Sequence, residues 1–247
     1  SSAVISPLAK VHPGASVGPF VVLEAGVEVA AEVVLGAGVY IGSNSRVGKG
    51  SRIYPQVVLY HDVHLGEHCI VHSQVVLGAD GFGFAPAENK SWLKIHQLGG
   101  VRIGDRVEIG ACSTVDRGTL GPTEIADGVI IDNHVQVGHN CHIGRNTALA
   151  GCVGLAGSTV IGENCTLAGG VGVVGHVSIC DNAHITGMTM VTKSITQPGS
   201  YSSGTPMSTS RDWKRQAVRF GQLDDMQRRL AALEREQDKN SGGNESQ

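Results

Sequence analysis

Two histidines and a glycine in the second half of the chain have types and spacings that could do chemistry. Gly157 lies 18 residues after His139, and His176 lies 37 residues after it. An imidazole can act as a general base near neutral pH. A glycine leaves its backbone N–H approachable, as an oxyanion donor must be. The three residues are therefore a candidate base, a candidate oxyanion donor and a second candidate active-site histidine.

A polar run precedes His139 by one repeat. Asp132 and Asn133 lie there without an evident packing role, and either could orient the His139 ring or bind polar groups of a substrate. Several of the 11 histidines are expected to lie at solvent-facing positions without a functional role. Spacing alone therefore leaves the role of His139 open.

A six-residue repeat must position these side chains. Aliphatic residues recur every sixth position from Ile5 to Leu77, from Ile103 to Val115 and from Ile125 to Val191. A small or β-branched residue follows four positions after each. Self-similarity at a fixed period predicts a stacked solenoid, and a six-residue period predicts a parallel β-helix with two inward side chains per repeat.

The pattern resembles the left-handed parallel β-helix of hexapeptide-repeat proteins, in which three repeats form one triangular coil. This resemblance implies 18 residues per coil and, here, about nine coils spaced by ~4.8 Å. Gly157 would then lie one coil above His139. His176 would lie on the same edge of the prism, on the order of 10 Å from His139 along the axis.

Composition agrees with an all-β solenoid. The chain has 247 residues, 35 of them glycine, few aromatics (4%) and a net charge of −3, which gives no reason to expect nucleic acid binding. Cys69, Cys141 and Cys165 occupy the small inward slot, so buried reduced thiols are expected. No signal peptide or transmembrane run is evident, which favours a cytoplasmic protein. Because the repeat begins at once without Met, we expect an N-terminal portion to be missing.

Two interruptions break the register. The first, at about 78–100, holds Phe82, Phe84 and Trp92 and must loop out of the coil. It either packs on its own prism face or reaches a neighbouring subunit or ligand groove. The second is short, at 120–124, where the step from Val115 to Ile125 is ten residues.

A helical segment follows the repeat. We expect a β-helix domain at 1–200, a helical extension at 208–238 and a disordered tail at 239–247. Ser210 is the expected N-cap of a first helix that runs to Phe220 and breaks at Gly221. Leu223, Met226, Leu230 and Leu233 would form the seam of a second helix. The first helix carries basic side chains that either form a solvated face or dock an acidic partner. These residues are Arg211, Lys214, Arg215 and Arg219.

Several motifs, in this order, resemble the UDP-3-O-(3-hydroxyacyl)glucosamine N-acyltransferases of lipid A biosynthesis. They are Gly81-Phe-Gly-Phe84, Ile103-Gly-Asp-Arg-Val-Glu-Ile-Gly-Ala111, Asp116-Arg-Gly118, Ile130-Ile-Asp-Asn133, His139-Asn140, Gly187-Met188, Tyr201-Ser-Ser-Gly204 and Leu223-Asp-Asp-Met226. The resemblance spans essentially the whole chain. A hexapeptide repeat alone would be weak, but the insertion, the polar run before His139 and the helical tail together are specific.

The resemblance implies transfer of a 3-hydroxyacyl chain from acyl carrier protein to the 2-amine of a UDP-linked O-acylated glucosamine. It matches His139 to the catalytic base, His176 to a second active-site histidine and Gly157 to the oxyanion donor. Asp132, Asn133 and Gln136 match substrate-binding positions, and Met190 matches a position that influences acyl length. The basic first helix matches the carrier-protein dock.

The resemblance further implies a homotrimer with acyl grooves between adjacent subunits, and no bound cofactor or metal. The co-substrate would be the phosphopantetheine thioester of the carrier protein. Peripheral association with the inner membrane is a further expectation. The family carries an N-terminal domain that contributes to the uridine pocket, and we expect this to be the portion missing here.

Three other functions remain as alternatives. One is a zinc enzyme of the hexapeptide-repeat type, using His134, His139 and His142, although their spacing turns them toward different faces. Another is a different hexapeptide-repeat acyltransferase, either a sugar O-acyltransferase or a CoA-dependent acetyltransferase. The third is a prism without catalytic activity.

Overall fold

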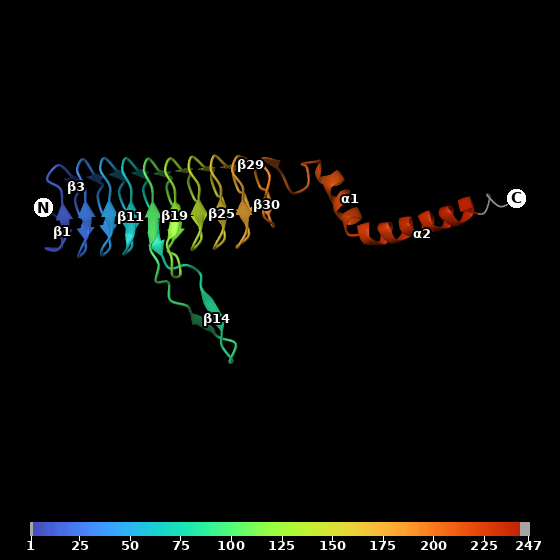
Figure 1. The fold of residues 1–247 in the computed structure, drawn as a ribbon, viewed down its shortest axis with the longest axis horizontal. Coiled ribbons are helices and arrows are strands. Elements are labelled where there is room, and N and C mark those ends of the chain that lie inside the picture. Colours follow the sequence, from blue (N-terminus) through green and yellow to red (C-terminus); the bar gives the residue numbers. More distant parts are fainter. Residues whose placement is uncertain (1, 243–247) are drawn as a thin grey trace. The chain divides into compact units, whose positions relative to one another are not determined.

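The structure is a computed structural model that describes residues 2–242, with side chains for residues 2–238. The chain divides into two compact units, Ser1–Gly204 and Thr205–Gln247. The first unit is a prism of short parallel strands with one projecting arm, and the second is helical (Figure 1).

Three parallel sheets form the faces of the prism, with ten, nine and ten strands. Face 1 consists of β1 (Val4–Ile5), β4 (Val22–Leu23), β7 (Tyr40–Ile41), β10 (Val58–Leu59), β13 (Val76–Ala79), β18 (Thr114–Asp116), β21 (Gln136–Val137), β24 (Gly154–Leu155), β27 (Gly172–Val173) and β30 (Met190–Val191). Face 2 consists of β2 (Lys10–Val11), β5 (Glu28–Val29), β8 (Arg46–Val47), β11 (Val63–Leu65), β16 (Val101–Ile103), β19 (Thr123–Ile125), β22 (His142–Ile143), β25 (Val160–Ile161) and β28 (Ser178–Ile179). Face 3 consists of β3 (Ser16–Val17), β6 (Val34–Leu35), β9 (Arg52–Ile53), β12 (Ile70–Val71), β17 (Glu108–Ile109), β20 (Ile130–Ile131), β23 (Ala148–Leu149), β26 (Thr166–Leu167), β29 (Ala183–Ile185) and β31 (Gly199–Tyr201).

The strand register confirms the parallel β-helix. Where the repeat is uninterrupted, each strand pairs with the strand 18 residues later, as in Val137 with Leu155 and Leu155 with Val173. The prism is slightly longer than nine coils, because β31 pairs with β29 beyond the point where the six-residue pattern ends.

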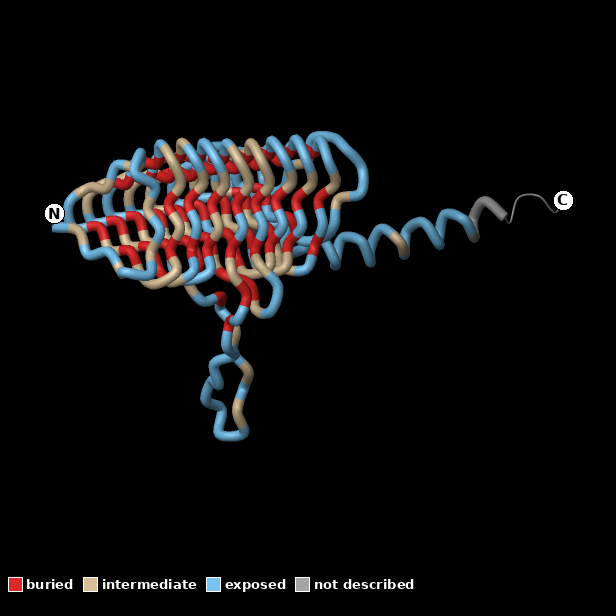
Figure 2. The backbone as a smooth tube through the Cα atoms, turned by 60° about the vertical axis from the view of Figure 1, so that its left-hand side comes forward, coloured by how far each residue is buried: buried red, intermediate tan, exposed pale blue. Residues whose placement is uncertain are grey.

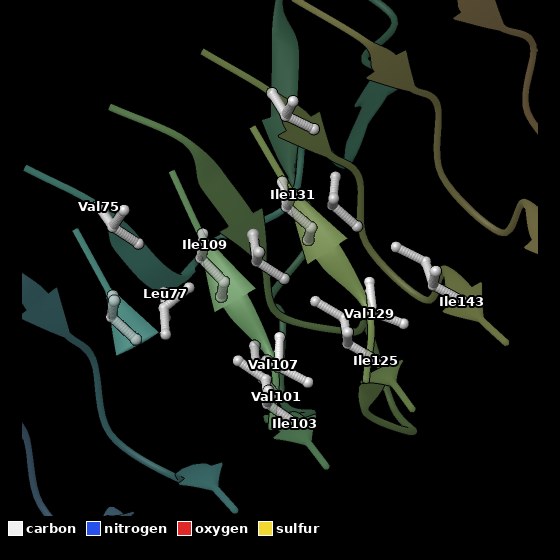
Figure 3. Packing of buried hydrophobic residues seen from close by; sticks show 14 of the residues in the cluster. Val75, Leu77, Val101, Ile103, Val107, Ile109, Ile125, Val129, Ile131 and Ile143 are labelled. Atoms are coloured by element: carbon white, nitrogen blue, oxygen red, sulfur yellow. The ribbon is translucent and has the colours of Figure 1, made fainter. Parts of the chain in front are cut away.

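Buried positions recur along the coils of the prism (Figure 2). The core is a column of stacked aliphatic side chains inside the prism (Figure 3). The sixth-position residues and the small residues four positions later are both inward, as Ile131 with Val135 and Val137 with Cys141 illustrate. Burying one such aliphatic side chain contributes about 1.5–3 kcal/mol, and the repeat multiplies that contribution along the axis. Cys69, Cys141 and Cys165 are buried free thiols as predicted.

Most corners between faces have the same backbone form. The second residue after each inward aliphatic, which we call the corner position, precedes at these corners a residue in the left-handed region, such as Asn140 at φ 58° and Ser158 at φ 60°. At several corners the outward N–H of one corner position is accepted by an Asp or Asn side chain at the corner position of the next coil. These pairs are Glu67 with Asp105, Asp105 with Asp127, Ala111 with Asn133, and Glu163 with Asp181.

The first interruption forms an arm that stands away from the prism in both views (Figures 1 and 2). Its two strands, β14 (Phe84–Pro86) and β15 (Trp92–Lys94), pair antiparallel. Phe82 and Trp92 are exposed on it. The arm therefore does not pack along its own prism face, which was one of the two predicted alternatives.

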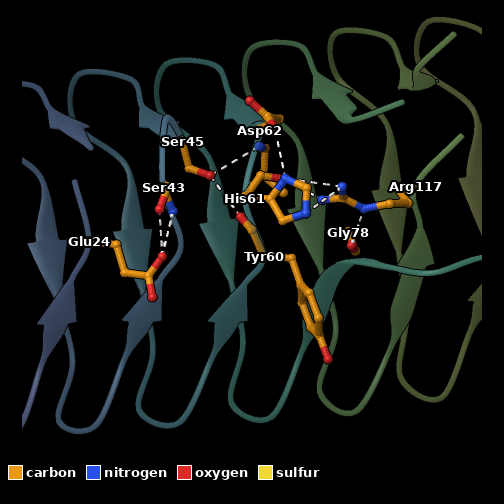
Figure 4. A network of polar contacts seen from close by, with 9 residues as sticks. Glu24, Ser43, Ser45, Tyr60, His61, Asp62, Gly78 and Arg117 are labelled. Atoms are coloured by element: carbon orange, nitrogen blue, oxygen red, sulfur yellow. Dashed lines mark hydrogen bonds and ion pairs between the residues drawn. The ribbon is translucent and has the colours of Figure 1, made fainter. Parts of the chain in front are cut away.

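A buried arginine fixes the point where the arm leaves face 1. Arg117 Nε donates to the Gly78 carbonyl over 2.8 Å, and its other nitrogens contact the ring and carbonyl of His61 (Figure 4). The Arg117 backbone N–H donates to the Ala79 carbonyl over 2.8 Å. Gly78 itself has φ 86°, and an added Cβ would lie 2.7 Å from Val63 Cγ2, so this turn requires glycine.

The helical unit contains α1 (Ser210–Phe220) and α2 (Leu223–Gly242). The prediction that Ser210 caps α1 is wrong by one residue, because the Thr209 hydroxyl accepts from the Asp212 N–H and Ser210 is the first helical residue. Gly221 ends α1 as predicted. The helix α2 continues to Gly242, four residues beyond the expected end of the helical extension at 238, and residues 243–247 lie outside the described residues.

Candidate active site

His139 lies at the corner between faces 1 and 2, with its ring between two glycines. A Cβ added to Gly157 would lie 2.5 Å from His139 Nε2 and 2.7 Å from its Cε1. A Cβ added to Gly81, at the base of the arm, would lie 2.6 Å from His139 Cβ and 3.0 Å from Cδ2. The stacking of Gly157 on His139 follows from the 18-residue coil, whereas the contact with Gly81 depends on the arm.

The neighbouring amide defines which nitrogen of the ring is basic. Asn140 Oδ1 accepts from the Thr119 N–H over 2.9 Å, and Asn140 Nδ2 donates to the Gly121 carbonyl over 3.1 Å. The atom facing His139 Nδ1 at 3.1 Å is therefore an acceptor. Since Nδ1 must then carry the proton in the neutral ring, Nε2 is the basic nitrogen, and Nε2 faces Gly157.

The Gly157 N–H has no hydrogen-bond acceptor within residues 2–242. The residue that could cap this N–H from the next coil is Gly175, which has no side chain. By contrast, the side chains of Asp105, Asp127 and Asp181 accept the corresponding N–H groups between faces 2 and 3. An outward, unsatisfied N–H therefore lies beside the basic nitrogen of His139. This is the arrangement that an acyl-transfer site needs.

His176 lies on the same corner, in the column of Asn140 and Ser158 and not in that of His139. It has φ 61°, is exposed, and its N–H donates to the Gly157 carbonyl over 3.2 Å. His176 thus follows Gly175 directly and lies on the same edge as His139, two coils away from it.

Asp116 is a member of the site that we did not select from the sequence. Its side chain is half-buried, and Gln136 Nε2 donates to its Oδ2 over 2.9 Å. Burial raises the pKa of the Asp116 carboxyl, while the Gln136 hydrogen bond and the nearby His139 oppose that rise. The Thr114 hydroxyl donates to Gln136 Oε1. The only sequence signal was the Asp116-Arg-Gly118 motif, which carried no assigned role.

Within one chain Asp132 and Asn133 do not reach His139, so they do not orient its ring there, and binding polar groups of a substrate stays the second predicted role. They lie at the corner between faces 3 and 1, where Asn133 Oδ1 accepts from the Ala111 N–H over 2.7 Å. Asn133 Nδ2 donates to Asp132 Oδ1 over 3.0 Å. One repeat advances the chain by one face of the triangle, so residues six apart occupy neighbouring corners.

A strip of outward glycines, called the trough below, runs along the axis of face 1 between these two corners. Above Gln136, the outward residues of face 1 are Gly154, Gly172 and then Met190. A Cβ added to Gly154 would meet no atom within 4 Å, and one added to Gly172 would lie 2.9 Å from Met190 Sδ. The trough therefore starts at the His139 level and ends at the exposed Met190 side chain.

A groove of about 610 Å³ lies on face 3, next to the corner of Asp132. Its lining includes Asp132, Asn133, Ala148, Ala150 and Thr166. In one chain the groove is open along the prism face. Its polar end, at Asp132 and Asn133, lies at the corner next to that of His139.

The remaining predicted positions lie in the helical unit. The basic residues Arg211, Lys214, Arg215 and Arg219 are all exposed on α1, and Arg215 Nη2 pairs with Asp212 over 2.8 Å. The other three have no ion-pair partner within the side chains that the structure describes.

The described residues show neither a cluster of metal ligands nor a membrane-spanning helix. Among the described side chains, no three His, Cys, Asp or Glu residues gather as metal ligands. His134 lies at the corner of Asp132, His139 at the next corner and His142 on face 2, where it pairs with Glu124 over 3.2 Å. No helix within residues 2–242 is long and apolar enough to cross a membrane.

Comparison with known proteins decides the family. Residues 44–79 match the family model "Bacterial transferase hexapeptide (six repeats)". The UDP-3-O-acylglucosamine N-acyltransferase of Pseudomonas fluorescens is 59% identical over 246 residues, which are 99% of this chain and 70% of that protein. The chain belongs to the UDP-3-O-acylglucosamine N-acyltransferase family.

Another member, from Pseudomonas savastanoi pv. phaseolicola, is 55% identical over 95% of this chain and 66% of that protein. The chain thus spans about two thirds of the length of these N-acyltransferases. The Francisella novicida UDP-N-acetylglucosamine acyltransferase shares the fold, with a TM-score of 0.66 and 24% identity over 86% of this chain and 73% of that one. The Moraxella catarrhalis UDP-N-acetylglucosamine O-acyltransferase also has a TM-score of 0.66, at 22% identity over 86% of this chain and 77% of that one.

Proposed function

We propose that this chain carries the transfer centre of a UDP-3-O-acylglucosamine N-acyltransferase. A 3-hydroxyacyl chain moves from the thioester of acyl carrier protein to the 2-amino group of UDP-3-O-(3-hydroxyacyl)glucosamine, a step of lipid A biosynthesis. The single observation that carries the proposal is the pairing of His139 Nε2 with the unsatisfied N–H of Gly157. The substrate pair comes from the names of the relatives and from the sequence motifs.

The chemistry needs only a base and an oxyanion donor, because a thioester is already activated. The sugar amine attacks the thioester carbonyl, and His139 Nε2 takes the proton that the nitrogen loses. The negative charge on the carbonyl oxygen is stabilised by the Gly157 N–H, a kind of contact worth about 3–4 kcal/mol. Collapse of the intermediate breaks the C–S bond, and the proton leaves with the thiol of the carrier.

Asp116 supports this cycle electrostatically. Its carboxylate acts on His139 and is held by Gln136. A negative group beside an imidazole stabilises the imidazolium that forms when the ring takes the amine proton. His176, two coils along the same edge, is available to bind polar groups of either substrate.

The acyl chain fits the trough. The space over Gly154 is open, and the Met190 side chain, whose Sδ lies over Gly172, closes the far end. Three coils separate Gln136 from Met190, a run of roughly 14 Å along the axis. Met190 is therefore the residue that we assign to chain-length selection.

A homotrimer completes the site. The trough and the face 3 groove are open on one chain, and Asp132 and Asn133 lie a corner away from His139. A three-fold assembly of parallel prisms sets one corner of each chain beside a different corner of its neighbour. Asp132 and Asn133 of one subunit then contribute to the substrate site at His139 of another.

The basic face of α1 is proposed to bind the carrier protein, whose surface is acidic. Arg211, Lys214 and Arg219 have no described ion-pair partner and offer their charge to a partner. We assign the reaction to the cytoplasm, with peripheral contact to the membrane that receives the lipid product.

An in vitro transfer assay tests the proposal. The full-length protein is incubated with UDP-3-O-acylglucosamine and either 3-hydroxyacyl carrier protein or acetyl-CoA. We expect N-acylated product with the carrier-bound donor alone. Product from acetyl-CoA alone, or O-acylation of a sugar without a free amine, would assign the chain to another class of acyltransferase.

A further inference from the structure

The two legs of the arm converge on His139 at the base of the arm. The outgoing leg brings Gly81 against His139, with an added Cβ 2.6 Å from His139 Cβ. The same Cβ would lie 2.9 Å from Oε1 of Gln97, a residue of the returning leg. Gln97 is only 6% exposed, whereas the tip residue Trp92 is 70% exposed. The base of the arm is thus packed as part of the prism, although its tip is not.

Hydrogen bonds then connect Gln97 to the second interruption. Gln97 Nε2 donates to the Ile95 carbonyl over 3.1 Å, which leaves Oε1 to accept from the Thr119 hydroxyl over 3.0 Å. The Leu98 N–H donates to the Thr119 carbonyl over 2.8 Å, and the Gly99 N–H to the Gly118 carbonyl over 2.9 Å. The returning leg therefore holds the short loop at 118–121 by both side chain and backbone.

That loop in turn holds the amide that faces the imidazole. The Thr119 N–H donates to Asn140 Oδ1, which is the atom beside His139 Nδ1. The Asn140 backbone N–H donates to the Thr123 hydroxyl over 2.8 Å, and Thr123 is fully buried. Gln97 thus holds Thr119 through its hydroxyl, and the Thr119 backbone N–H together with the Gly121 carbonyl orients the Asn140 amide that faces His139 Nδ1. The ring position and its tautomer therefore depend on where this loop is held.

We propose that Gln97 and Thr119 are positioning residues of the transfer reaction, which act on His139 through Asn140. The base of the arm is then part of the catalytic apparatus, separate from any contact made by the tip. This inference rests on the proposed function for its kinetic consequence, but its structural consequence, the tautomer of His139, does not depend on activity.

Paired variants of the full-length enzyme test the inference. Gln97→Leu removes the acceptor for Thr119 with little change in volume. Thr119→Val removes the hydroxyl at equal size, while Thr119→Ser keeps the hydroxyl and serves as the rescue. Glu88→Ala changes an exposed residue near the arm tip and is the control. The readouts are kcat and KM for both substrates, and the ¹⁵N shifts of the His139 ring.

We expect Gln97→Leu and Thr119→Val to lower kcat about tenfold with little change in either KM, because small displacements of a base cost one to two powers of ten. Their His139 ring should lose the single Nδ1–H tautomer. Thr119→Ser and Glu88→Ala should behave as wild type.

Wild-type kcat with an unchanged ring spectrum in Gln97→Leu and Thr119→Val would overturn the inference. An equal loss in Thr119→Ser and Thr119→Val would also overturn it, since the hydroxyl would then not matter. If the wild-type enzyme transfers no acyl chain, the proposed function fails. The ¹⁵N spectra would still decide whether the arm base holds the ring.

Discussion

The corner between faces 2 and 3 and the corner of His139 share a backbone form but differ at several coils in the polar side chains that they carry. At the first, Asp105, Asp127 and Asp181 accept the outward N–H of the coil before. At the second, Gly157 and Gly175 occupy the equivalent positions, and the Gly157 N–H is unsatisfied within the described residues. The backbone repeat is alike at both edges, so the side chain at the corner position determines whether the N–H of the coil before is capped or left as a donor.

The comparison also separates stability from function. A carboxylate that caps an N–H stabilises the fold, typically by about 0.5–1.5 kcal/mol per hydrogen bond. An N–H without a cap lacks that stabilisation of the fold. It can instead donate to the oxyanion of a transition state, where the hydrogen bond contributes more free energy. Substitutions on the two corners should therefore affect different measurements.

The largest effect should come from His139→Ala. Removal of the general base is expected to lower kcat by about 10²–10⁴-fold. His142→Ala, three residues later on face 2 and paired with Glu124, is the matched control and should keep the wild-type rate. Transfer assays on both variants check this. Full activity in His139→Ala would exclude His139 as the general base.

Gly157→Ala should have the next largest effect. Its Cβ would lie 2.5 Å from His139 Nε2, so the ring must move and substrate access to the N–H is reduced. We expect a loss of about 100-fold in kcat. Gly169→Ala is the control for adding a methyl group at a corner, because its Cβ would lie 3.5 Å from the nearest atom. Similar losses in both variants would contradict a special role of Gly157.

Asp116→Asn should lower the rate and leave the fold at least as stable. The pKa of Asp116 is raised by burial, so its ionised form is less favourable in the folded chain than in the unfolded chain. Stability from this group is present at low pH and lost as pH rises through the folded pKa. The variant should therefore melt at the same or a higher temperature at pH 7.

Its kcat should fall by about tenfold, because an imidazolium without its carboxylate loses on the order of 1.4 kcal/mol. Melting curves at pH 4–8 together with transfer rates separate the two effects. A lower melting temperature at pH 7 with an unchanged rate would assign Asp116 to the fold alone.

The smallest effect on the rate should come from the capped corner. Asp181→Ala removes the acceptor of the Glu163 N–H and should cost about 1 kcal/mol of unfolding free energy with no change in kcat. Asp181→Asn keeps an acceptor, as Asn133 does for Ala111, and should be close to wild type. Denaturant unfolding measures the difference. Equal stability of the two variants would show that the cap contributes nothing.

The sequence predicts what depends on the period and misses what depends on the interruptions. The 18-residue coil was enough to set Gly157 against His139 and to bring His176 to the same edge. It did not reveal Gly81, Gln97 and Thr119, because these residues reach His139 through segments that leave the register. A loop follows no fixed rise or turn, so its contacts cannot be counted from spacing.

The error over Asp132 and Asn133 has a simple geometric cause. Closeness in sequence suggested closeness to His139, but six residues carry the chain along one face to the next corner. Only multiples of 18 residues return it to the same corner. The helix cap was misplaced by one residue, since Thr209 and Ser210 are both good N-cap types and the sequence does not decide between them.

The most direct test moves the cap of one corner to the other. Gly175→Asn would offer an acceptor to the Gly157 N–H, whereas Gly175→Leu has nearly the same shape and no acceptor. Either side chain would place its Cβ 2.9 Å from the Gly157 carbonyl oxygen, so the two variants are compared with each other and not with the wild type. If the unsatisfied N–H is the oxyanion donor, kcat of Gly175→Asn should be about 100-fold below that of Gly175→Leu in the same transfer assay. Equal kcat values in the two variants would contradict the assignment of Gly157.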